Sequence, residues 1–417
     1  MELLKEALSE IKPTDKEEKE LASKISLFVK KLNTGLKDAK AELYGSGAKG
    51  TWLKGGFDAD IFVKYNYSKF KDKSEEISKE LEKHLRKKKI EFKTMHGSRD
   101  YFRIEKDGLV YEIIPILDIK NSSEAKNITD ISPLHAKWVK ANSNKKMIDE
   151  IRLAKAFLKA NRLYGAESYI RGFSGYATEI LVIYYKGFLG FLKAALKWKD
   201  KQVIDIKKYH KNAFMSMNKS KLDSPIIIVD PVDKTRNAAA ALSYEKAVNL
   251  KELAKKFLKE KSKKYFKEEK ISIESLKKKS KGKKLIVIDI KAVRGKEDVV
   301  GAKIMKSYCF ILKNLNDKEF RAVNSGWTWD KAKKAMIWLV FENKELDKHK
   351  EHEGPKKEMK EHCEIFKKKY KNTYEKDGRL YAKAEREFTD AESYIKTLLK
   401  DDWFKGKIKS AEAKKIQ

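Results

Sequence analysis

Residues 45–65 read GSGAKGTWLKGGFDADIFVKY, a glycine-rich loop followed by two closely spaced aspartates. Asp58 and Asp60 stand two positions apart on a predicted strand, so both side chains project from the same face. Two carboxylates on one face repel each other unless a cation lies between them, and hard oxygen ligands favour magnesium. A polar sheet edge with no ligand is the alternative for this pair taken alone. The stretch thus predicts a strand that carries a divalent metal site.

The loop that precedes these acids is suited to phosphate. Its glycines permit close backbone approach to a ligand, Ser46 offers a hydroxyl and a backbone donor at a predicted helix start, and Lys49 adds a positive charge. A phosphate cradle beside a metal site is what a nucleoside triphosphate requires. The loop therefore favours the metal site over the plain sheet edge.

A third acid, Glu112, interrupts the apolar run LVYEIIPIL at residues 109–117. A charge inside such a strand is costly unless it is paired or bound to metal. Asp118 is a fallback ligand, and it shares the face of Glu112 only if the strand continues through Pro115. Because proline cannot donate to a sheet ladder, we expect the strand to end before it.

Together these motifs resemble the DNA polymerase beta type nucleotidyltransferases, and more closely the archaeal, class I CCA-adding tRNA nucleotidyltransferases. The resemblance continues beyond the first 120 residues. It is carried by SPLHAKW (residues 132–138), RLAKAFLKANRLYGAESYIRGFSGY (152–176), VDPVDKTRNAAAALS (229–243) and, in degenerate form, EGPKKEMKEHCEIF (353–366).

The resemblance implies roles for individual residues. Asp58 and Asp60 would bridge two Mg²⁺ ions, and Glu112 would be the third metal ligand at a position where the family usually has aspartate. Contacts to the triphosphate and sugar are implied for Ser46, Lys49, His135, Lys155 and Tyr164, and reading of the incoming base for Asp233 and Arg236.

Some of these residues have plainer explanations. A lone histidine such as His135 is often structural, and Lys155 with Lys159 one turn later could form an ordinary solvated helix face. Arg236 and Asp233 have the donors and acceptors to read a base edge, yet either could make an ion pair that shapes its loop.

The predicted fold is α+β, with a polymerase beta-like head of mixed sheet and helices, a helical neck, and a ferredoxin-like α+β body with a tail. The predicted boundaries are residues 1–140 for the catalytic head, 141–258 for the neck and 259–417 for the basic body and tail. Nearly all of residues 149–258 has a helical period. The lysine-rich residues 259–284 are the predicted linker.

The function implied is template-independent addition and repair of the 3'-terminal CCA of tRNA from CTP and ATP, with recognition of the acceptor and T arms. One alternative is another polymerase beta-like RNA nucleotidyltransferase that forms poly(A) or oligoadenylate. A second, from a different class, is an RNA-binding protein with a degenerate active site, which the Glu112 departure keeps open and the intact Asp58 and Asp60 disfavour. A homodimer is left open by the sequence.

Composition agrees with a polyanionic partner. The net charge is +34 over 417 residues, and each neutralised phosphate would release condensed counterions.

The amino terminus predicts a short amphipathic helix that stops near Pro13 rather than a signal peptide. The apolar residues 177–198 carry charges and a break at Gly187, which favours a buried helix pair over a membrane span. Two cysteines without metal-ligand spacing indicate a reduced, cytoplasmic setting.

Overall fold

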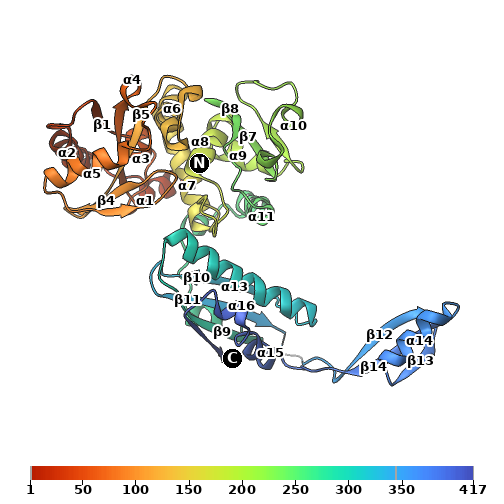
Figure 1. The fold of residues 1–417 in the computed structure, drawn as a ribbon. Helices are drawn as coiled ribbons and strands as arrows, with labels where there is room; N and C mark the ends of the chain where they lie inside the picture. Colours follow the sequence, from red (N-terminus) through yellow and green to blue (C-terminus); the bar gives the residue numbers. More distant parts are fainter. Residues whose placement is uncertain (1, 343–344, 417) are drawn as a thin grey trace. The chain divides into compact units, whose positions relative to one another are not determined.

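The computed structural model describes residues 2–342 and 345–416, which divide into two compact units, residues 1–269 and 270–417. Figure 1 shows the elements of both units coloured along the chain. The structure is α+β throughout, as the sequence predicted. The finer division of the chain at residues 140 and 258 stays a prediction.

The first part of unit 1 is a five-stranded sheet in the order β1-β2-β5-β4-β3. Its central pair, β2 and β5, is parallel, and the other neighbouring strands are antiparallel. Helices α2 and α5 pack their apolar residues on this sheet to form one core. The elements are α1 (Glu2–Ile11), α2 (Asp15–Asn33), β1 (Ala39–Leu43), α3 (Gly45–Lys49), β2 (Asp58–Asn66), α4 (Tyr67–Phe70), α5 (Ile77–Lys87), β3 (Lys93–Met95), β4 (Tyr101–Lys106) and β5 (Leu109–Asp118).

Strand β5 continues through Pro115 to Asp118, so the expectation that it ends before the proline is wrong. The reason is that β4 pairs with β5 only as far as Ile113, whereas β2 follows β5 to its end. Pro115 therefore lies where one edge of β5 has no strand partner, a position that tolerates a missing N–H. Its carbonyl accepts a hydrogen bond from the Arg99 guanidinium at 3.1 Å.

The second part of unit 1 has a largely helical core, but the expectation that nearly all of residues 149–258 is helical is wrong. Residues 202–237 contain a three-stranded sheet in the order β6-β7-β8. Its middle strand is the β-branched run IIIVD, which is buried along its whole length and suits a strand better than a helix. The elements are α6 (Ser132–Ala141), α7 (Lys145–Ala160), α8 (Gly175–Tyr184), α9 (Phe188–Ala195), β6 (Gln202–Ile204), α10 (Ala213–Ser216), β7 (Ile226–Asp230), β8 (Asp233–Asn237) and α11 (Tyr244–Glu260), with short 3₁₀ turns at Ser122–Glu124, Ile128–Ile131, Lys219–Lys221 and Lys263–Phe266.

The apolar residues 177–198 form the predicted buried helix pair. Helices α8 and α9 are separated at Gly187, whose φ of 129° is a backbone conformation that favours glycine. Within the described residues, no helix has the length and apolar character that crossing a membrane would require.

Unit 2 contains two sheets, β10-β11-β9-β15 and β12-β14-β13. The long helix α13 and the shorter α15 share the core of the first sheet. The elements are α12 (Ile273–Lys279), β9 (Lys284–Lys291), α13 (Glu297–Asp317), β10 (Asn324–Trp329), β11 (Lys334–Phe341), β12 (His349–Lys356), α14 (Lys360–Lys369), β13 (Thr373–Lys376), β14 (Arg379–Glu385), α15 (Ala391–Leu398), α16 (Asp402–Lys405) and β15 (Ser410–Lys415).

The lysine-rich residues 259–284 are more structured than the predicted linker. They include a 3₁₀ turn with buried Tyr265 and Phe266, and helix α12, whose Leu276 is buried. The division between the two units falls within this stretch. Aromatic and aliphatic residues between the lysines, such as Tyr265, Phe266 and Leu276, pack into the interior. The high lysine content made this packing hard to predict from composition.

Candidate active site

The two aspartates lie on one face of β2, as their spacing predicts. Along the strand Asp58 is exposed, Ala59 is buried, Asp60 is half-buried and Ile61 is buried. In the parallel register between β2 and β5, Asp60 lies directly opposite Glu112. Neighbouring residues of two paired strands project from the same side, so the sheet brings all three predicted carboxylates to one face.

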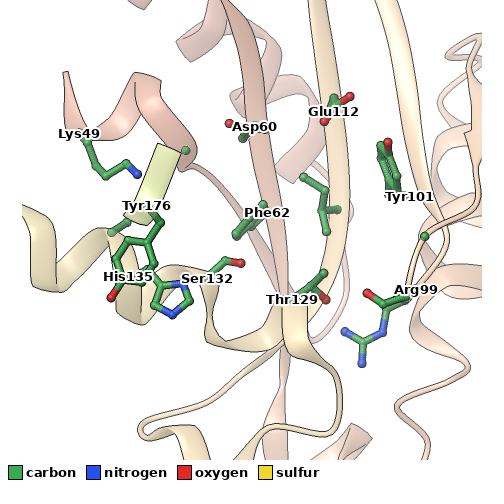
Figure 2. Close-up of a pocket in the computed structure, with 15 residues that line it drawn as sticks. Lys49, Asp60, Phe62, Arg99, Tyr101, Glu112, Thr129, Ser132, His135 and Tyr176 are labelled. Atoms are coloured by element: carbon green, nitrogen blue, oxygen red, sulfur yellow. The ribbon is translucent and has the colours of Figure 1, made fainter. Parts of the chain in front are cut away.

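A cavity of about 330 Å³ lies at this face, and we call it the carboxylate hollow. Figure 2 shows Asp60 and Glu112 on neighbouring strands, Lys49 on α3, and Ser132 and His135 on α6. These five residues and Tyr176 are among those that line the hollow. Four of the residues chosen from the sequence, Lys49, Asp60, Glu112 and His135, thus meet at one cavity.

The phosphate loop touches the acids closely. Gly45 has a φ of 59°, and a Cβ atom at this position would lie 1.7 Å from Asp60 Oδ2. Only glycine permits that approach. Ser46 follows within α3, and Gly50, with a φ of 68°, caps the carboxyl end of that helix. Gly45 therefore allows α3 to lie against the Asp60 carboxylate.

The electrostatics of Asp60 favour a nearby positive charge. Burial raises the pKa of Asp60 to about 6, the charge of Asp58 adds to the rise, and Lys49 and Lys155 oppose it. Among residues 2–342 and 345–416 no three His, Cys, Asp or Glu side chains are gathered closely enough to hold a metal ion. The donor set is nonetheless two hard carboxylates on β2 with a third in register on β5, which fits Mg²⁺ by its chemistry.

Asp118 does not join these acids. It lies six residues beyond Glu112, faces Lys64 at 3.5 Å and lines a separate cavity with Lys64, Lys120, Lys137 and Lys140. At about 3.3 Å per residue, six residues along a strand separate the two acids by about 20 Å. The continued strand therefore does not make Asp118 a ligand of the same metal.

Lys49 and Lys155, both predicted to contact phosphates, pair with the same glutamate, which was not predicted as a site residue. Glu179 is completely buried and pairs with the ammonium groups of Lys49 and Lys155, each at 2.7 Å. Lys155 is 4% exposed, so the alternative of a solvated helix face is wrong for it, although Lys159 is exposed. Tyr164 lies nearby, because a Cβ atom on Gly175 would be 2.7 Å from its hydroxyl and 3.9 Å from Lys155 Nζ.

A second buried acid, Asp230, organises the other predicted contacts. It accepts hydrogen bonds from His135 Nε2 at 2.8 Å, Arg236 Nη1 at 2.7 Å and the Tyr176 hydroxyl at 3.0 Å. Burial lowers the pKa of His135, although Asp230 opposes the change. A carboxylate has no proton to give, so Nε2 carries the proton of the neutral ring and donates it.

The loop predicted to read the base is held by internal bonds. Asp233 Oδ1 accepts from the backbone N–H of Thr235 at 3.0 Å and from its hydroxyl at 2.7 Å, so both bonds lie within β8. Arg236 is paired with Asp230, and its side chain remains 29% exposed. Neither residue lines the carboxylate hollow. Their role in reading the base stays a prediction.

Glu179, Asp230 and Tyr176 were missed as site residues, although the sequence contained a signal for the two acids. Each acid sits in or at the end of an apolar run, the same pattern that singled out Glu112. Tyr176 gave no such signal, because an aromatic residue at a helix start is an ordinary packing residue.

Comparison with known proteins places this arrangement in a class and then in a family. Residues 22–132 match the family described as nucleotidyltransferase domain, residues 149–267 the second domain of tRNA nucleotidyltransferase, and residues 281–410 the C-terminal domain of CCA-adding enzyme. By these matches and by its fold, the chain is a nucleotidyltransferase.

Relatives along the whole chain define the family. The CCA-adding enzyme of Nanoarchaeum equitans is 37% identical over 83% of each chain. That of Methanocaldococcus jannaschii is 32% identical over 96% of this chain and 90% of its own, and that of Sulfurisphaera tokodaii 30% identical over 93% and 90%. The chain belongs to the archaeal CCA-adding enzymes.

Solved structures share the fold. A Cid1 poly(U) polymerase structure superposes with a TM-score of 0.52 at 16% identity, over 64% of this chain and 98% of that one. A cytoplasmic RNA terminal U-transferase gives a TM-score of 0.50 at 16% identity, over 65% and 99%. At this identity the likeness concerns the fold alone.

Proposed function

We propose that the chain adds and repairs the 3'-terminal CCA of tRNA, using CTP and ATP and releasing pyrophosphate. The observation that carries the proposal is the convergence of Asp60, Glu112 and Lys49 at one hollow in a chain of this family. A carboxylate pair and a phosphate-binding cation are what attack of an RNA 3'-hydroxyl on an α-phosphate requires.

The proposed work of the residues follows from their positions. Asp58 and Asp60 would hold Mg²⁺, and Glu112 on β5 would complete the site from the opposite strand. When bound, Mg²⁺ would lower the pKa of the attacking hydroxyl and neutralise the leaving phosphates. Lys49, which retains 11% side-chain exposure at the hollow, would meet the triphosphate together with the Ser46 hydroxyl.

Five further residues belong to the proposal. Lys155 and Tyr164 would act from the middle region on the phosphates and sugar. His135, which lines the hollow and donates to Asp230, would orient the sugar. Arg236 and Asp233 would read the base, with Arg236 fixed by the same Asp230. The cytoplasm is the compartment we propose, and dimerisation stays an open prediction.

The test is incubation of the protein with Mg²⁺ and a tRNA transcript that lacks its last three nucleotides, with each labelled triphosphate alone and with CTP and ATP together. Product length and sequence are read after gel separation. We expect two C residues from CTP, and a final A only when ATP is added as well. Long homopolymers from ATP alone would favour the poly(A)-forming alternative, and no extension would favour the inactive RNA-binding alternative.

A further inference from the structure

The cluster around Glu179 contains more than an ordinary ion pair. Its Oε2 accepts from Lys49 Nζ at 2.7 Å, and its Oε1 accepts from Lys155 Nζ at 2.7 Å and from the Thr51 hydroxyl at 3.0 Å. Lys155 Nζ also donates to Thr51 Oγ1 at 2.9 Å. Both oxygens of the buried Glu179 carboxylate thus accept hydrogen bonds, and this one acid pairs with two lysines.

The three elements that meet here come from different parts of unit 1. Lys49 ends helix α3 of the five-stranded sheet region, Lys155 is on α7, and Glu179 is on α8. Lys49 also lines the carboxylate hollow with Asp60. Glu179 therefore ties a cation of the phosphate loop to a cation of the helical region.

Charge explains why the carboxylate is needed. The side chains of Lys49 and Lys155 are 11% and 5% exposed, and a buried charge is costly unless an opposite charge pairs with it. Burial alone would raise the pKa of Glu179, but Lys155 and Lys49 outweigh it and lower the pKa to about 2. With two ammonium groups and one carboxylate, the cluster carries one net positive charge, and Lys49 presents it to the hollow.

We propose that Glu179 is a positioning residue for nucleoside triphosphate binding, which holds Lys49 and Lys155 side by side as a prearranged pair of cations for the phosphates. The idea rests on the proposed function, since it concerns the same nucleotide site. Glu179 touches no substrate in this account, because the two lysines stand between it and an anion. It therefore acts on the nucleotide and not on the RNA.

The test is Glu179→Gln, which keeps the volume and removes the charge. Steady-state kinetics with the shortened tRNA should show the KM for CTP and for ATP each rising about 30-fold or more, as expected when one partner of a buried charge pair is lost. The kcat should change less, and tRNA affinity, measured by filter binding, should not change. An unchanged KM in the folded variant would make Glu179 purely structural, and a lower KM would mean that it competes with the nucleotide for the lysines.

A matched control uses another ion cluster on α7. Arg152 is 3% exposed and pairs with Asp149 and Glu18, both at 2.9 Å. Asp149→Asn should lower the Tm and leave the KM for both nucleotides unchanged. If Glu179→Gln behaves like this control, with an altered Tm and unaltered KM, the positioning role is overturned.

A double-mutant cycle tests whether Glu179 works through the lysine. Lys49→Met should raise the KM, and adding Glu179→Gln should raise it far less than the product of the two single effects. Fully multiplicative effects would contradict the proposal. Should Glu179→Gln fail to fold, Thr51→Val preserves all three charges and should raise the KM in the same direction by a smaller factor, whereas an unchanged KM would overturn the role.

The two proposals fail separately. If the wild-type protein extends no tRNA, the proposed function is wrong, and equilibrium dialysis with labelled CTP and ATP still compares wild type with Glu179→Gln. Weaker nucleotide binding by the variant would support the positioning role, and equal binding would overturn it.

Discussion

The two units of the chain use charge in opposite ways. In residues 2–269 six charged side chains are buried, and each has a partner of opposite charge at hydrogen-bond distance: Arg99, Asp130, Arg152, Lys155, Glu179 and Asp230. In the described part of residues 270–417 the buried polar residues are Ser280 and Ser307, and no charged side chain is buried. Unit 1 thus fixes charges inside the protein, whereas unit 2 displays them to solvent.

This difference has energetic consequences. Removing one partner of a buried ion pair costs about 3–5 kcal/mol, because the other charge is left without compensation. An exposed pair such as Lys283 with Glu342, 39% and 61% exposed, contributes about 0–1 kcal/mol. Single substitutions in unit 1 should therefore have large and specific effects, and single substitutions of lysines in unit 2 small and interchangeable ones.

The largest effect is expected at the carboxylates. Asp60→Ala should lower nucleotide addition by about 10³-fold or more, because several kcal/mol of metal-dependent stabilisation is lost. tRNA affinity should change little, since the basic surface remains. Rapid-quench assays and filter binding measure the two quantities. Asp118→Asn, on the same face and away from the hollow, is the control that should retain activity, and near-normal addition by Asp60→Ala would show that the metal lies elsewhere.

Glu112 offers a sharper test of the same site. Glu112→Asp should preserve or improve the rate, since the family resemblance places aspartate at this position, and Glu112→Ala should lower it by at least about tenfold, or 1.4 kcal/mol. Rates at saturating Mg²⁺ and nucleotide compare the two variants. No effect of Glu112→Ala, or complete loss with Glu112→Asp, would move the third ligand to another residue.

A smaller effect is expected at Arg236. Arg236→Ala should lower CTP and ATP addition by about 10- to 100-fold, in line with the contribution of about 1.5–3 kcal/mol from a hydrogen bond that involves a charged group, and relax discrimination against UTP and GTP. Competition assays with all four nucleotides give the fidelity. Arg236→Lys should recover part of it. Undiminished fidelity with reduced tRNA affinity would instead make Arg236 a phosphate contact.

The smallest effects are expected in unit 2. Replacing one exposed lysine, for example Lys367→Ala, should lower tRNA affinity slightly and reduce the slope of log affinity against log salt by about one unit. Fluorescence anisotropy at several salt concentrations provides the slope. A single lysine variant of unit 2 that abolishes binding would contradict the view that the charge acts diffusely.

Sequence patterns predicted those parts of the site whose residues lie close together in the sequence. The Asp58–Asp60 pair needed only strand alternation, and the glycine loop needed only its neighbours. The partners of Lys49, Lys155 and Arg236 come from residues more than 20 positions away or from another strand, so periodicity could not supply them. Glu179 and Asp230 could be recognised from the sequence as charges inside or beside apolar runs, where a charge is costly. The neighbouring sequence, however, did not indicate which residues would pair with them.

The fold was predictable to a similar depth. The strands that carry Asp58 and Glu112 and the helix pair at Gly187 follow from the hydrophobic period and from the positions of glycine and proline. The β6-β7-β8 sheet was missed because its middle strand has five residues, too short for a period to separate it from a helix segment. Pro115 was misjudged because the extent of β4, a property of tertiary structure, decides whether a proline is tolerated.

The measurement that tests the account most directly compares two RNAs of equal length as substrates. One is a minihelix that carries only the stacked acceptor and T arms and lacks its CCA end, and the other is unstructured. Since A-form RNA offers shape and backbone rather than readable major-groove bases, we expect the minihelix to be extended with CCA and the unstructured RNA to be a poor substrate. Equal extension of both RNAs would contradict the assignment of tRNA as substrate.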